Sequence, residues 1–156
     1  TLMMSSVLSE QHKQGWVFGI DKYLPEDLEN RLFEKADLIY LIEGDSLSED
    51  VLWNVTVAKE QHPKGCLVVL DSLHTEEHVL KELEVYSEFA DYFIVCDTII
   101  EDLKKSEDRP WGPGNSPRTA IDKFLKMNKE WERDEEMCNK MLISCQPDGY
   151  LRRKKV

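Results

Sequence analysis

The chain has 156 residues, of which 41% are hydrophobic and 33% charged, as expected for one globular domain with a single core. Its net charge of -11 argues against a nucleic-acid partner, because phosphate contacts need clustered Lys and Arg. No apolar stretch reaches the roughly 18 residues that span a bilayer. No secretory leader is visible and the four cysteines are scattered, so we expect a cytoplasmic protein with reduced thiols.

Helical and strand-like stretches alternate along the chain. The spacing of apolar residues changes between the period of about 3.6 residues that is typical of a helix and the short runs that are typical of strands. In chain order we predict a helix up to residue 15, a strand over 16–21, a helix over 25–34, a strand over 37–45, a helix from Ser46 or Ser48 to about residue 61, a strand ending at 71, a helix over 75–89 and a strand ending at 97. A long Pro- and Gly-rich loop over 101–117 follows. After it we predict a helix over 119–127 and, within 140–153, a strand, a turn at 147–149 and a short extension.

This order predicts an α/β fold with a doubly wound, mostly parallel sheet and an antiparallel ending. No repeat or internal boundary is visible, so we expect a single domain over residues 1–156.

Two predicted strands deliver an acid to the sheet edge where open α/β proteins bind ligands. The run CLVVLD ends in Asp71, with His74 on the following loop, and YFIVCD ends in Asp97. Two aspartates and one imidazole at this edge predict a site for a divalent metal and a base. Alternatively, each aspartate caps the helix or turn that follows it.

The two earlier strands also end in acids. Asp21 is placed to bind the hydroxyls of a ribose, and the Gly44–Asp45 pair to face an adenine amino group. The glycine-rich turn expected after the first strand is missing, so Asp21 alone is also interpreted as an ordinary surface acid.

A resemblance to a known family rests on six stretches: GWVFGID (15–21), LIEGDS (41–46), LVVLDSLHTEEHVLKELEVY (67–86), DYFIVCDTIIED (91–102), DRPWGPGNSPRTAIDKFL (108–125) and NKMLISCQPDGYLRR (139–153). They cover most of the chain, which resembles the cephalosporin hydroxylase-like family. That family has the Rossmann-like fold of S-adenosylmethionine-dependent methyltransferases and includes sugar and rhamnosyl O-methyltransferases. The resemblance implies an S-adenosylmethionine site that contains Gly19, Asp21, Gly44, Asp45 and Ser46.

The resemblance also implies that Asp71 and Asp97 bind Mg²⁺, a cation that prefers oxygen ligands. His74 matches a histidine thought to be the general base, which takes the proton of the acceptor hydroxyl. Some relatives have a third carboxylate where this chain has Cys96, and a thiol is a poor magnesium ligand. We therefore expect the metal to be held more weakly, or its shell to be completed by water, substrate, Glu101 or Asp102.

The composition of the long loop predicts that residues 106–117 close over the acceptor, with Trp111 stacking on a sugar ring. The alternative is that Trp111 only plugs the core. The family's first strand and glycine-rich loop are expected immediately before Thr1.

The leading hypothesis is thus an S-adenosylmethionine-dependent, Mg²⁺-assisted O-methyltransferase whose small-molecule acceptor is a sugar or glycoside. A truncated or cofactor-dead domain is one alternative. A hydroxylase is another, although redox iron usually needs two histidines and one carboxylate. A homo-oligomer is compatible with the sequence.

Overall fold

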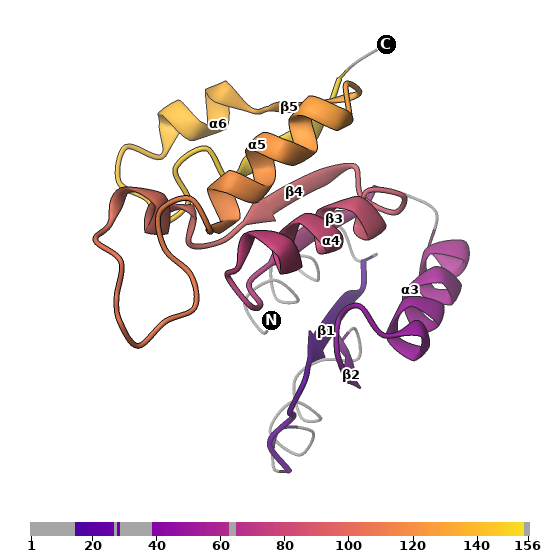
Figure 1. Ribbon diagram of the computed structural model, residues 1–156. Coiled ribbons are helices and arrows are strands. Elements are labelled where there is room, and N and C mark those ends of the chain that lie inside the picture. Colours follow the sequence, from indigo (N-terminus) through magenta and orange to yellow (C-terminus); the bar gives the residue numbers. More distant parts are fainter. Residues whose placement is uncertain (1–14, 27, 29–38, 63–64, 155–156) are drawn as a thin grey trace. The chain divides into compact units, whose positions relative to one another are not determined.

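The computed structural model describes residues 15–26, 28, 39–62 and 65–154 (Figure 1). The chain divides into two compact units, residues 1–61 and 62–156, and each is described by itself. The helix predicted up to residue 15 and most of the helix predicted over 25–34 lie outside the described residues. The expectation of a single domain stays a prediction.

Two parallel strands, β1 (Val17–Asp21) and β2 (Ile39–Glu43), form the sheet of the first unit, with Val17 opposite Ile39 and Asp21 opposite Glu43. Helix α3 (Glu49–Gln61) follows β2, with Glu49 and Asp50 beside its positive N-terminus. Both strands and the helix confirm the sequence prediction. Because α3 begins at Glu49 and the Ser48 hydroxyl accepts from the Val51 amide at 3.4 Å, Ser48 rather than Ser46 caps it.

The second unit contains a four-stranded sheet in the order β3-β4-β6-β5. Its strands are β3 (Leu67–Leu70), β4 (Tyr92–Val95), β5 (Trp131–Arg133) and β6 (Tyr150–Arg153). Strands β3 and β4 are parallel, whereas β6 is antiparallel to both of its neighbours. The predicted antiparallel ending is confirmed, but the described sheets are partly rather than mostly parallel. This α/β arrangement is consistent with a Rossmann-like methyltransferase fold.

Two helices, α4 (Glu76–Tyr86) and α5 (Pro117–Met127), lie side by side along the sheet of the second unit (Figure 1). Their buried apolar residues recur at helical spacing, as one packed face requires. The core beneath them includes an aromatic cluster in which Phe93, Phe124 and Trp131 have ring centroids 5.0 to 6.4 Å apart. This cluster packs α5 against strands β4 and β5.

The strand predicted within residues 140–145 is wrong. A short helix, α6 (Glu135–Lys140), ends where that strand was expected to begin, and the exposed side chains of Leu142 and Ile143 belong to the irregular segment after it. Asp134 starts α6, because its carboxylate accepts from the Met137 amide. The sequence pattern also missed β5, which has only three residues and two charged side chains. No described helix is long and apolar enough to cross a membrane.

Candidate active site

The loop after β3 is held by a buried carboxylate from α4. Glu82 is only 1% exposed, and its Oε2 accepts a 2.6 Å hydrogen bond from the Ser72 hydroxyl. Its Oε1 lies 3.3 Å from Nε2 of His78, one turn earlier on the helix. Because Ser72 stands between Asp71 and His74, Glu82 sets the path of the backbone that carries both site residues.

The end of β4 is fixed against the end of β3. The Cys96 amide donates to the Leu70 carbonyl at 2.9 Å, which keeps the two strand ends together. Asp97 then adopts the left-handed conformation, with φ 54° and ψ 29°, and starts the 3-10 helix η1 (Thr98–Asp102). Aspartate is among the few L-residues that tolerate this conformation, which costs conformational energy and is enriched at functional sites.

Asp71, His74 and Asp97 come together at this edge, as the sequence predicts. Nε2 of His74 lies 3.2 Å from Oδ2 of Asp97 and 3.6 Å from Oδ1 of Asp71. One ligand atom from each residue lies within 4.8 Å of the others. Nε2 is buried yet makes no hydrogen bond of acceptable geometry. A buried polar atom without such a bond costs free energy unless another ligand satisfies it.

The alternative in which these acids serve as caps does not fit the geometry. Asp97 makes no side-chain capping bond to η1, and the residue that precedes α4 is Thr75. In the described residues, no backbone amide donates to the carboxylate of Asp71 or Asp97. Both carboxylates are therefore available for a ligand.

The donor set fits a divalent cation. Two carboxylates and one imidazole nitrogen converge, and carboxylate oxygens suit Mg²⁺. Burial and the nearby Asp71 carboxylate raise the pKa of the Cys96 thiol, which keeps it protonated and a poor ligand. Glu101 and Asp102 bond to other groups and are not part of this cluster, and the suggestion that they complete the shell stays a prediction.

A pocket of about 570 Å³ opens beside this cluster, within the size range of small-molecule sites. It is lined by Ser72, Leu73, His74, Asp97, Ile100, Arg109 and Trp111. The Trp111 ring lies 5.2 Å from the His74 ring, centroid to centroid, and the Arg109 guanidinium lies 5.1 Å from the Trp111 ring centroid. Trp111 is thus a neighbour of the predicted base, and its role in stacking on a sugar ring stays a prediction.

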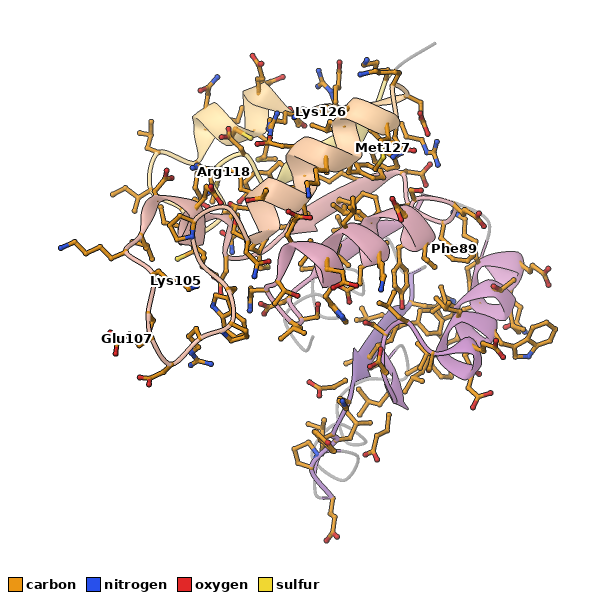
Figure 2. All side chains as sticks on the ribbon, in the orientation of Figure 1. Phe89, Lys105, Glu107, Arg118, Lys126 and Met127 are labelled. Carbon is orange, nitrogen blue, oxygen red and sulfur yellow. The ribbon has the colours of Figure 1, made fainter. Side chains whose placement is uncertain are left out.

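The loop that carries Trp111 is anchored at its base. Glu101 accepts from the Gly114 amide at 3.0 Å and from the hydroxyls of Ser116 and Thr119, and Arg118 makes two bonds to Asp102. Burial alone would raise the pKa of Glu101, but these hydrogen bonds lower it below its ordinary value. Figure 2 shows Arg118 at the base of the loop and Glu107 pointing away from it.

The residues predicted for the cofactor lie in the first unit. Gly19 is in the middle of β1, and Asp21 ends this strand with its carboxylate accepting from the Tyr23 amide at 3.0 Å. The Asp45 carboxylate likewise accepts from the Leu47 amide at 3.0 Å. Both acids therefore stabilise local turns, and each is exposed. Their roles in cofactor binding stay predictions.

Gly44 and Ser46 flank Asp45 after β2. The Gly44 amide donates to the Asp21 carbonyl at 2.8 Å, which joins the ends of the two strands. A Cβ at Gly44 would lie 2.7 Å from Cγ2 of Val51, so α3 packs too closely for any larger residue. Packing alone thus accounts for this glycine, and the cofactor roles of Gly44 and Ser46 stay predictions.

A model of the rhamnosyl O-methyltransferase/CmcI family matches residues 1–154, nearly the whole chain. The chain belongs to this family. The match confirms the resemblance drawn from the sequence, since cephalosporin hydroxylases and sugar O-methyltransferases are grouped in it. No curated protein and no solved structure matches the chain.

Sequence reasoning missed the structural roles of three residues of this rhamnosyl O-methyltransferase/CmcI family member. The burial of Glu82 could have been predicted, because an acid four residues after His78 falls on the same helix face as the buried Val79 and Leu83. Glu101 was considered only as a metal ligand. The sequence gives no indication of its bond to Gly114 or of the contact between Arg109 and Trp111, because these partners lie across a loop whose path the sequence does not define.

Proposed function

We propose that this protein is an S-adenosylmethionine-dependent, Mg²⁺-assisted O-methyltransferase that acts on a hydroxyl of a sugar or glycosylated metabolite. The observation that carries the proposal is the buried Nε2 of His74, which faces the carboxylates of Asp71 and Asp97 beside a pocket that is also lined by Trp111. Membership of an O-methyltransferase family supports the reaction type.

In the proposed reaction, the acceptor lies in the pocket against Trp111, with its hydroxyl beside Nε2 of His74. His74 takes the hydroxyl proton as the acceptor oxygen forms a bond to the methyl carbon of S-adenosylmethionine. The bond from that carbon to sulfur breaks, and the sulfonium becomes the neutral thioether of S-adenosylhomocysteine. The protein's main contribution is the positioning of the two reactants.

The metal would be held by Asp71 and Asp97, with His74 left to accept the proton. When bound there, Mg²⁺ supplies Lewis-acid chemistry that lowers the pKa of a coordinated hydroxyl. The His74 nitrogen cannot be ligand and base at once, so the assignment favours the oxygen donors that magnesium prefers.

Hydroxylation is the weaker alternative for this site. Non-haem iron oxygenases typically use two histidines and one carboxylate. The cluster found in the described residues has the reverse composition, with one histidine and two aspartates.

Calorimetric titration with S-adenosylhomocysteine, with and without Mg²⁺, tests the proposal. We expect binding, and we expect the Mg²⁺ titration to show a metal site that Asp97→Asn weakens. A folded chain that binds neither S-adenosylhomocysteine nor Mg²⁺ would contradict the proposal and favour a domain without catalysis. Transfer of a labelled methyl group to a panel of glycosides would then identify the acceptor.

A further inference from the structure

We propose that the acceptor carries an anionic group, a carboxylate, sulfate or phosphate, and that Arg109 binds it. This inference rests on the proposed function, because it assigns the substrate class of the same pocket. It follows from the charge of Arg109, its place in the pocket and the way its loop is held.

Arg109 differs from the other described arginines in its partners. Arg118 and Arg133 pair with aspartates, Arg152 pairs with Glu132, and Arg153 donates to backbone carbonyls. In the part of the chain that the structure describes, the Arg109 guanidinium has neither kind of partner and lies over the ring of Trp111. The chain has a net charge of -11 and is rich in acidic side chains, yet Arg109 pairs with none of those that the structure describes.

The position of Arg109 is set by the structure of the loop. Gly112 and Asn115 exchange backbone hydrogen bonds of 3.0 and 2.9 Å, and the Asn115 side chain donates to the Pro110 carbonyl at 2.9 Å. The same side chain accepts from the Glu76 amide at the start of α4. The stem of Lys105 lies across Gly112, so close that a Cβ there would be 3.0 Å from its Cγ. The segment next to Arg109 is therefore tied to α4 and to itself.

The residues that line the pocket include groups of opposite charge. His74 and Asp97 provide the base and a carboxylate, which attracts a cation and repels an anion. Arg109 offers a planar set of donors suited to two-point binding of a carboxylate, sulfate or phosphate. Trp111 neighbours both His74 and Arg109 and offers an apolar surface for a sugar ring. An acceptor that carries both a hydroxyl and an anionic group matches this set of residues.

Two matched pairs of probes test the inference: methyl glucuronide against methyl glucoside, and glucose 6-phosphate against glucose. Binding is followed through the NMR signal of the Trp111 indole N–H, assigned by its loss in Trp111→Phe, with Mg²⁺ present at low ionic strength. We expect each anionic probe to bind about tenfold more tightly than its neutral partner, as a charge-assisted hydrogen bond predicts. Added salt should reduce the preference.

Variants distinguish the effect of Arg109 on anion binding from the effect of the overall charge of the loop. Arg109→Gln should remove the preference and Arg109→Lys should restore part of it. Lys104→Gln, which removes the same charge from the same loop outside the pocket, should keep the preference in full. Equal behaviour of charged and neutral probes, whether both bind or neither binds, would overturn the inference, as would a preference that survives Arg109→Gln.

The inference and the proposed function can fail separately. A charge preference without any binding of S-adenosylhomocysteine would keep the anion site and contradict the methyltransferase. Binding of S-adenosylhomocysteine without a preference for anionic probes would keep the methyltransferase proposal and contradict the anion site.

Discussion

The two units use the same sequence pattern, a strand followed by an acid, in different ways. In the first unit, Asp21 and Asp45 each bind a backbone amide two residues further along the chain. In the second unit, Asp71 and Asp97 cap nothing and instead face the same nitrogen of His74. The residue type and its place after a strand are therefore not what distinguishes a site from a turn.

What differs is the structure around the acid. In the second unit, Glu82 holds the loop after β3 and the anchored loop before α5 brings Trp111 to His74. These long-range contacts turn two strand ends into a pocket. The comparison predicts that variants in the second unit alter chemistry and metal binding, whereas those in the first alter cofactor binding alone.

The largest expected effect is that of His74→Ala. Loss of a general base lowers kcat by about 10² to 10⁴-fold. S-adenosylhomocysteine affinity should stay within a few fold, because the residues predicted to bind the cofactor lie in the first unit. Steady-state kinetics and calorimetry on the same preparation measure the two quantities.

His62→Gln is the matched control for His74→Ala, because it removes an imidazole that lies outside both the pocket and the cluster. It should leave kcat near the wild-type value. A large loss of cofactor affinity in His74→Ala would show that His74 is not simply the base.

The next prediction compares the aspartates of the two units. Asp71→Asn and Asp97→Asn should each weaken Mg²⁺ binding by about tenfold or more, because each removes a charged oxygen ligand. Asp21→Asn, the same chemical change in the first unit, should weaken S-adenosylhomocysteine binding and leave Mg²⁺ affinity unchanged. Calorimetric titrations of both ligands into all three variants give the comparison. If Asp21→Asn weakened Mg²⁺ binding as much as Asp97→Asn, the assignment of separate roles would be wrong.

The sequence predicted the strand-end acids but not what surrounds them. Asp71, His74 and Asp97 were found because parallel strands present their carboxyl ends at one edge, which depends only on local pattern. Contacts such as Glu82 to Ser72 join residues from separate elements, and a pattern of one segment does not contain them. The strand predicted within 140–145 failed for a related reason, since those apolar residues lie in an exposed irregular segment after a helix capped by Asp134.

A smaller effect is expected at the base of the loop, where Glu101→Gln removes a charged acceptor from three donors. The unfolding free energy should fall by about 2 kcal/mol near neutral pH. The folded pKa of Glu101 lies below its ordinary value of 4.5, so its contribution is present above that pH and is lost as the pH falls through the folded pKa. The difference in unfolding free energy between wild type and variant, measured by urea unfolding, should therefore shrink as the pH is lowered from about 7 to about 3. A difference that is constant over this range would mean that the charge of Glu101 does not matter.

The smallest expected effect is that of Trp111→Ala, which should raise the KM of the acceptor several-fold and change that of the cofactor little. The reason is that Trp111 lines the pocket in the second unit, beside His74, and is not among the residues predicted for the cofactor. Trp53→Ala, the loss of a 69% exposed indole on α3, is the control and should change neither constant. Kinetics with each substrate varied in turn measure both constants. A larger change in the cofactor KM would place Trp111 on the cofactor side and remove the division of roles between the two units.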